Sequence, residues 1–119
     1  MLRDPAWLLD MLMGCRRVME YSHTMSEADF TASHRDQDAI LHQLMIVGEA
    51  GKQVSAAFKD GHPEIPWSKI GRFRDLVVHH YFGVDMMEVW RIVQNEIPLL
   101  ASQLTPLVPP EDPPADGGA

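Results

Sequence analysis

Hydrophobic residues recur through most of this chain at intervals of three and four, the spacing that lines one side of an α-helix. The first stripe follows Asp4-Pro5, which supplies an N-cap and a proline at the first helical position, and it runs to about Tyr21. A short helical turn with a serine cap is expected over residues 26–30, and a long helix from Ser33 to Lys59. Strand-like alternation is absent from the sequence, so the pattern predicts an all-α fold.

A second long stripe follows the glycine- and proline-rich connector at residues 61–66. Pro66 begins this helix, which should end around His80 because Phe82-Gly83 supplies a stop signal. We expect the helix to turn one set of side chains inward, comprising Trp67, Ile70, Phe73, Leu76 and Val77.

The last helix begins at Asp85, which forms a capping-box-like start with Glu88 three residues later. Pro98 predicts a kink in this helix or an irregular second half. Together the elements predict an up-and-down bundle of four main helices plus a short one, in one domain over residues 1–105. Residues 106–119 contain five prolines and three acids, a composition that predicts a disordered tail.

Small residues interrupt the long helix at Gly48, Ala50 and Gly51. Each glycine weakens a helix by up to about 1 kcal/mol relative to alanine. The compensation that we expect is close approach of another helix at this point.

The charge distribution limits the possible partners. A formal net charge of −7 argues against a non-specific nucleic-acid binder, which usually carries a basic face. Removing the three acids of the predicted tail leaves −4 for residues 1–105. The sequence also holds one local cationic stretch, interrupted only by Asp75 and comprising Lys69, Arg72, Arg74, His79 and His80. Such a patch can bind phosphate inside an acidic protein.

Two absences indicate the compartment. Cys15 is the single cysteine, so no intrachain disulfide can form, and we expect it to be a small buried apolar residue. Charges interrupt every apolar run that could cross a membrane, and the N-terminus lacks the pattern of a signal peptide. We therefore expect a cytoplasmic protein without a membrane partner.

Residues 74–81 contain the most informative chemistry of the chain. Arg74 is a fixed cation with a planar fork of donors, His79 can exchange protons near neutral pH, and Tyr81 offers a hydroxyl. These groups can bind or cleave a phosphodiester, and the hypothesis requires no metal and no cofactor. His79 would act as base on a ribose 2′-hydroxyl or as acid on the leaving 5′-oxygen, which restricts the substrate to RNA. Arg74 would stabilise charge on the phosphoryl oxygens, and Asp75 would orient Arg74 or a histidine.

Helix geometry places a condition on this hypothesis. Arg74 and Tyr81 fall on nearly the same side of an ideal helix, whereas Arg74 and His79 point about 140° apart. Either the helix unwinds near His79, or a second copy of the protein completes the site. We favour both together, because Phe82-Gly83 makes unwinding credible and a two-fold dimer places two arginines and two histidines in one groove.

Other polar and aromatic residues have simpler interpretations. His34, Asp38 and His42 lie on one side of the long helix at a spacing that can hold zinc. A solvated polar face is the preferred interpretation, since no fourth ligand is evident. Trp67 and Trp90 lie on apolar stripes and are assigned to the core rather than to base stacking.

Several segments resemble the HepT-type branch of the HEPN superfamily. The similarity lies in residues 64–70, 74–85 and Val89-Trp90, with further likeness at 46–52 and 98–100. It covers about residues 4–104 and leaves the tail outside. Arg72 is a departure, because relatives often have an apolar residue there; its extra charge near the cleft can alter RNA affinity or dimer packing.

HepT proteins are the toxin halves of bacterial and archaeal toxin–antitoxin pairs. The resemblance implies an all-helical homodimer with a composite cleft, and a metal-independent endoribonuclease that leaves 2′,3′-cyclic phosphate ends. It also implies a type VII-like pair in which a minimal nucleotidyltransferase (MNT) antitoxin adds AMP to Tyr81. Carried over from the family, Arg74 and His79 are the catalytic pair. The supporting positions are Asp75, His80 and Arg72.

One rival hypothesis belongs to a different class of protein. The same chain could form a non-catalytic helical dimer that binds nucleotide, RNA or a nucleotidyltransferase without turnover. Growth arrest on expression that is lost in His79→Ala would separate catalysis from binding.

Overall fold

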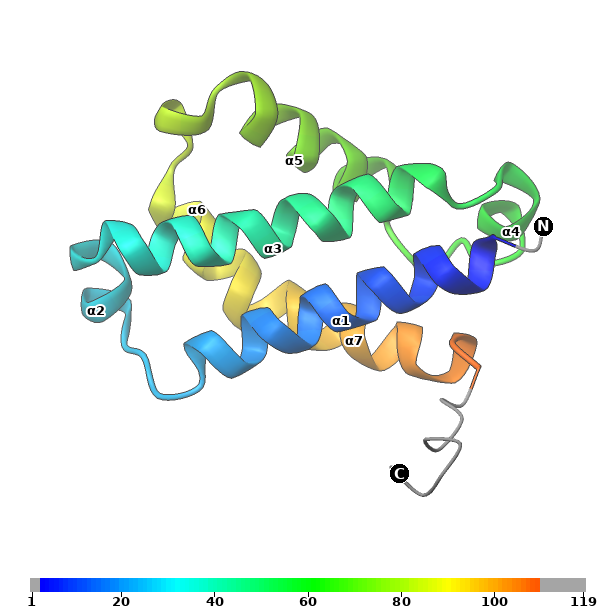
Figure 1. The fold of residues 1–119 in the computed structure, drawn as a ribbon, viewed down its shortest axis with the longest axis horizontal. Coiled ribbons are helices and arrows are strands. Elements are labelled where there is room, and N and C mark those ends of the chain that lie inside the picture. The colour runs from blue at the N-terminus through cyan, green and yellow to red at the C-terminus, as the bar shows by residue number, and fades with distance from the viewer. Residues whose placement is uncertain (1–2, 110–119) are drawn as a thin grey trace, which may run out of the picture.

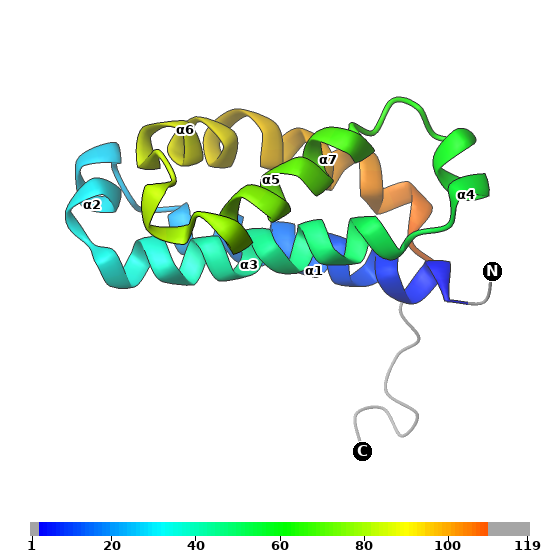
Figure 2. The ribbon, with the colours of Figure 1, turned by 90° about the horizontal axis from the view of Figure 1, so that it is seen from above.

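Two long helices, α1 (Asp4–Ser22) and α3 (His34–Gln53), run antiparallel beside each other and form the base of the fold (Figure 1). The computed structural model describes residues 3–109, and every regular element in this part of the chain is helical. α7 (Ile97–Leu104) packs along α1, and α5 (Trp67–His79) lies over α3, as the view from above shows (Figure 2). The prediction of an all-α bundle is confirmed.

The apolar core lies where α1, α3 and α7 meet. Its buried side chains include Leu8, Met11 and Val18 from α1, Ile40, Leu41 and Leu44 from α3, and Ile97, Leu100 and Leu104 from α7. Cys15 is fully buried among them, as expected, and desolvation raises the pKa of its thiol to about 12. None of the helices within residues 3–109 is long and apolar enough to cross a membrane.

The predicted long helix over residues 33–59 is wrong in one respect, because it breaks near Ser55. α3 ends at Gln53, Val54 is extended and buried, and a separate short helix, α4, covers Ala56–Asp60. The Asp4 carboxylate accepts hydrogen bonds from the Ser55 backbone N–H at 2.9 Å and from its hydroxyl at 2.6 Å. A contact between residues 51 positions apart in the chain therefore fixes the break.

The same contact corrects the predicted N-cap of the first helix. Asp4 is the first residue inside α1, and Arg3 occupies the cap position without a side-chain hydrogen bond. The serine cap of the short second helix, α2 (Glu27–Ala32), is confirmed. Ser26 and Asp29 form a reciprocal capping box there, with both bonds at 3.0 Å.

Close packing of α5 on α3 depends on Gly48. A Cβ atom at Gly48 would lie 2.3 Å from the Arg74 Cβ, nearer than real carbon atoms approach. A Cβ atom at Gly51 would lie 3.3 Å from both the Ile70 side chain and the Met11 methyl group. The expectation that these glycines admit another helix is confirmed, and the admitted helix is the one that carries Arg74.

The last predicted helix is continuous in direction but changes its pitch. α6 (Met86–Arg91) passes through a π-helical turn (Ile92–Glu96) into α7. The Ile97 N–H bonds the Ile92 carbonyl, five residues back. Pro98 cannot donate a backbone hydrogen bond, and the irregularity predicted for this helix lies in the turn just before it.

The start of α6 also differs in detail from a capping box. Asp85 caps the helix by accepting the Met87 N–H at 2.9 Å. Glu88 instead binds Arg91, which also reaches Glu96 at 2.6 Å. The prediction of a helix start at Asp85 is confirmed. The Glu88 carboxylate does not cap the helix but pairs with Arg91.

Helix α5, which carries Arg74 and His79, is only partly covered by the rest of the protein. Val77 is its one buried residue, whereas Leu76, which the sequence placed inward, is 44% exposed. α5 rests on α3, and an apolar groove of about 270 Å³ separates it from the π-helical turn and α7. The groove is lined mainly by Leu44, Ile70, Phe73, Leu76, Ile92 and Leu100. Trp67 and Trp90 pack against the core, in agreement with their assignment.

The end of the described chain reaches slightly beyond the predicted domain. Thr105–Leu107 form a 3-10 turn, and Leu107 and Val108 pack against the core. Residues 106–108 of the predicted tail are therefore structured. Residues 110–119 of the predicted tail lie outside the described part of the chain.

Candidate functional site

Arg74 lies on the side of α5 that faces α3. Because Gly48 has no side chain, the aliphatic part of Arg74 crosses α3 at close range. Its Nε forms an ion pair with Glu49 Oε1 at 3.1 Å, and its Nη1 donates a hydrogen bond to Asp75 Oδ1 at 3.1 Å. Two carboxylates from two helices thus hold the guanidinium in one orientation, and the planar fork retains further N–H donors for a ligand.

Asp75 joins Arg74 to a second cation. Its Oδ1 atom also accepts a hydrogen bond from Lys52 Nζ at 2.8 Å. The bond from Lys52, followed by the bond from Arg74, holds the pKa of the Asp75 carboxyl below its ordinary value, so the group is charged near neutral pH. Of the two roles expected for Asp75, the structure shows the contact with Arg74.

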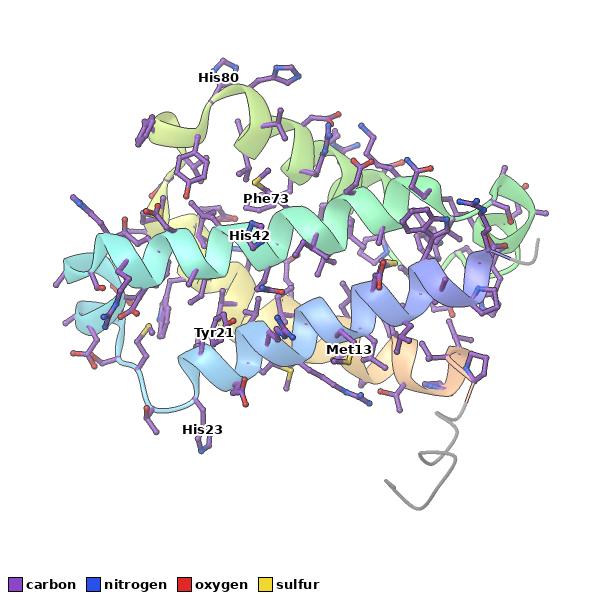
Figure 3. All side chains as sticks on the ribbon, in the orientation of Figure 1. Met13, Tyr21, His23, His42, Phe73 and His80 are labelled. Carbon is purple, nitrogen blue, oxygen red and sulfur yellow. The ribbon has the colours of Figure 1, made fainter. Side chains whose placement is uncertain are left out.

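His79 and His80 are both exposed at the C-terminal end of α5. His80 points away from the bundle (Figure 3). α5 stays α-helical through His79 and leaves helical geometry at His80, with φ −138° and ψ 45°. The expected unwinding therefore begins one residue after His79, and Arg74 and His79 keep directions about 140° apart. Within residues 3–109, no hydrogen bond joins the two side chains.

Tyr81 lies beyond the helix, in a 3-10 turn formed by Tyr81–Gly83. Its hydroxyl donates to Asp38 Oδ1 on α3 at 2.7 Å. Partial burial, and then the Asp38 bond and charge, raise the pKa of Tyr81 to about 12. Phe82 packs edge-on against the Tyr81 ring and is itself 99% exposed.

One side of α3 therefore holds both ends of the motif. Asp38 and Glu49 are eleven residues apart, which places them within about 20° of each other and about 16 Å apart along the axis. Asp38 binds Tyr81 and Glu49 binds Arg74, so residues 74–81 are held against α3 at both ends of the motif. Arg74 and Tyr81 do face the same neighbour, as predicted, although Tyr81 is no longer helical.

The sequence analysis did not identify Glu49 or Lys52 as site residues, and it considered Asp38 only as a possible zinc ligand. Glu49 and Lys52 fall within the family-like segment 46–52, which was the available signal. Asp38 was considered with His34 and His42 as a zinc site, and it binds Tyr81 instead. In the part of the chain that the structure describes, no three His, Cys, Asp or Glu side chains gather as a metal site.

The fold and this arrangement define a helical domain of the HEPN class. Comparison with known families matches residues 11–107 to the family described as "Ribonuclease HepT-like". The chain belongs to this family of ribonucleases. Comparison with solved structures gave no match.

Named relatives agree with the family assignment. The chain is 36% identical over 101 residues to a "Probable ribonuclease HepT" of Thermococcus cleftensis, covering 85% of this chain and 92% of the relative. It is 32% identical over 93 residues to a "Putative RNase" of Methanocaldococcus jannaschii, covering 78% and 77% respectively. A "Putative RNase" of Caldanaerobacter subterraneus is 31% identical over 105 residues, covering 88% and 94%.

The Tyr81–Asp38 bond predicts a shifted titration. In Asp38→Asn the pKa of Tyr81 should fall from about 12 toward its ordinary value of 10.0, because the amide carries no negative charge. Absorbance at the tyrosinate band should show this shift, with Tyr21 as the internal reference and Tyr81→Phe to assign the signal. A titration curve unchanged by Asp38→Asn would contradict the role given to the bond.

The sign of the linked stability effect follows from the raised pKa. The folded state favours neutral Tyr81, so its contribution is complete below pH 10 and is lost as the pH rises through about 12. Chemical denaturation across this range should show that Asp38→Asn reduces the loss.

Proposed function

We propose that this protein is a metal-independent endoribonuclease that acts as the homodimeric toxin of a cytoplasmic toxin–antitoxin pair. The observation that carries the proposal is Arg74, fixed by Glu49 and Asp75 on a helix that ends at the exposed His79. Membership of the HepT-like ribonuclease family supports RNA as the substrate.

The reaction follows from these groups. His79 accepts the proton of a ribose 2′-hydroxyl, whose oxygen attacks the adjacent phosphorus. The bond from phosphorus to the 5′-oxygen breaks, and a protonated histidine returns a proton to the leaving oxygen. Arg74 stabilises the charge that develops on the phosphoryl oxygens. The products are a 2′,3′-cyclic phosphate and a free 5′-hydroxyl.

Two features of α5 support the dimer. Its apolar residues Phe73 and Leu76 line an open groove, and Leu76 is 44% exposed. Arg74 and His79 diverge on one helix, so a second copy is the simplest way to present both to one phosphate. A two-fold axis near α5 also supplies two histidines, one to act as base and one as acid.

Control by a minimal nucleotidyltransferase antitoxin is the second part of the proposal. Transfer of AMP to the Tyr81 hydroxyl adds bulk and a negative phosphodiester beside the motif. Modification also removes the proton that Tyr81 donates to Asp38, and it places an anion next to that carboxylate. We infer that both effects displace the turn at residues 81–83 and repel RNA.

The same arginine also favours a second candidate function. Arg74 is already paired with two carboxylates, so its charge is largely compensated before any RNA arrives. A non-catalytic dimer that binds RNA, nucleotide or the nucleotidyltransferase would need no more than this arrangement.

Cleavage of labelled RNA in excess chelator tests catalysis. Wild-type protein should cut the RNA and leave 2′,3′-cyclic ends, and His79→Ala should reduce the rate at least about 100-fold, the usual contribution of a general acid or base. His23→Ala is the matched control, since His23 is exposed far from the motif (Figure 3). Equal rates in all three proteins would remove His79 from the mechanism, and no cleavage by wild type would favour the binding-only function.

Sedimentation tests the dimer. The wild-type mass should be twice the chain mass of 13.4 kDa, and Leu76→Asp should shift the protein to the monomer by placing a charge in the apolar groove. Leu99→Asp is the control, because Leu99 is 58% exposed on α7 and does not line the groove. A monomeric wild type, or dimer loss in both variants alike, would count against an interface at α5.

Intact mass tests the modification. Wild-type protein co-produced with a minimal nucleotidyltransferase of the proposed antitoxin class should gain the mass of one or more AMP groups, and Tyr81→Phe should gain none. Tyr21→Phe should be modified as wild type is. An adduct that persists in Tyr81→Phe would place the modification elsewhere.

A further inference from the structure

A polar hollow of about 350 Å³ lies beside the motif helix, distinct from the apolar groove, although Arg72 borders both. It forms where the end of α3 and α4 meet the first turns of α5. Its walls carry the cations Lys52, Lys59 and Arg72, the ring of Trp67 and the Asp75 carboxylate. We refer to it as the cationic hollow.

The charge of the cationic hollow opposes that of the protein. The chain has a net charge of −7, yet three cations face one carboxylate here. That carboxylate is engaged by Lys52 at 2.8 Å and by Arg74 at 3.1 Å. Lys59 Nζ donates a long hydrogen bond to the Lys52 carbonyl at 3.5 Å. Across residues 3–109, neither Lys59 nor Arg72 forms an ion pair, so no carboxylate compensates their charges.

The walls also suit an extended nucleotide chain. Lys59 Nζ lies 6.0 Å from the centre of the Trp67 ring, so an ammonium group and an aromatic surface are adjacent. Gly71 adds no side chain, and a Cβ atom there would meet nothing nearer than Lys52 Cγ at 3.5 Å. Basic groups beside an aromatic ring are the combination that binds single-stranded nucleic acid.

We propose that the cationic hollow binds backbone phosphates of the RNA strand next to the phosphate held at Arg74. This inference rests on RNA being the ligand in the proposed function. Lys59 and Arg72 bind the phosphates. Trp67 packs against the core but is only partly buried, and the part of its ring that lines the hollow contacts the sugar or base between them.

Asp75 makes the cationic hollow continuous with the proposed catalytic site. One of its oxygen atoms accepts bonds from Arg74 on one side and Lys52 on the other. Arg72 and Ser68 lie about 5 and 10 Å from Asp75 along the helix axis. A strand whose reactive phosphate lies at Arg74 therefore reaches the hollow within one or two nucleotides, and an acidic protein gains a local site for an anionic substrate.

Binding of a fluorescent single-stranded RNA by the full chain, measured by anisotropy as a function of salt, tests the proposal. All proteins carry His79→Ala, so cleavage does not interfere. The double variant Lys59→Gln/Arg72→Gln should raise Kd about tenfold and reduce the salt slope by about 1.4, the value for two phosphate contacts on a single strand. The control, Arg16→Gln/Arg17→Gln, makes the same charge change at exposed positions on α1.

Each result decides a separate question. If the parent binds RNA normally and the double variant has the same Kd and salt slope, the cationic hollow does not bind RNA. The ribonuclease proposal would remain intact. An equal loss in both double variants would show a general charge effect and would also overturn it. If the parent protein binds no RNA, the result would contradict both the proposed ribonuclease function and RNA binding in the cationic hollow.

Discussion

The contact of α5 with α3 at Gly48 is the constraint on which the site depends. A methyl group at this position would overlap the Arg74 Cβ at 2.3 Å, so the missing side chain sets how near the two helices lie. At that separation Arg74 reaches Glu49, the next residue of α3, and Lys52 reaches Asp75 across the same interface. A wider spacing would separate these charged groups and leave a flexible arginine, whose ordering on RNA would cost conformational entropy.

The same geometry explains why α5 is at once well positioned and incompletely buried. α3 supports it along one side, through Arg74 near the middle of α5 and through the Tyr81–Asp38 bond just beyond its C-terminal end. The opposite side borders an apolar groove, with Val77 as the single buried residue of the helix. A helix held in this way leaves one polar edge and one apolar edge accessible, and the proposed function requires the first for RNA and the second for another copy of the chain.

Much of the fold could be predicted because helix signals are local. Ser26 capped its helix as expected, and the glycine pair of α3 marked a close approach of another helix. The break at Ser55 could not be predicted, since it depends on a carboxylate 51 positions earlier. The exposure of Leu76 could not be predicted either, because a regular apolar stripe does not show whether a neighbouring helix covers it.

The sequence by itself determined the helical class, the motif residues Arg74, His79 and Tyr81, and the divergence of the first two on one helix, since each follows from residue type and a fixed turn per residue. Tertiary structure alone decided the partners: Glu49 for Arg74, Lys52 for Asp75, and Asp38 for Tyr81. These partners lie 23 to 43 positions away along the chain for all three pairs, and only helix packing brings them within hydrogen-bond distance.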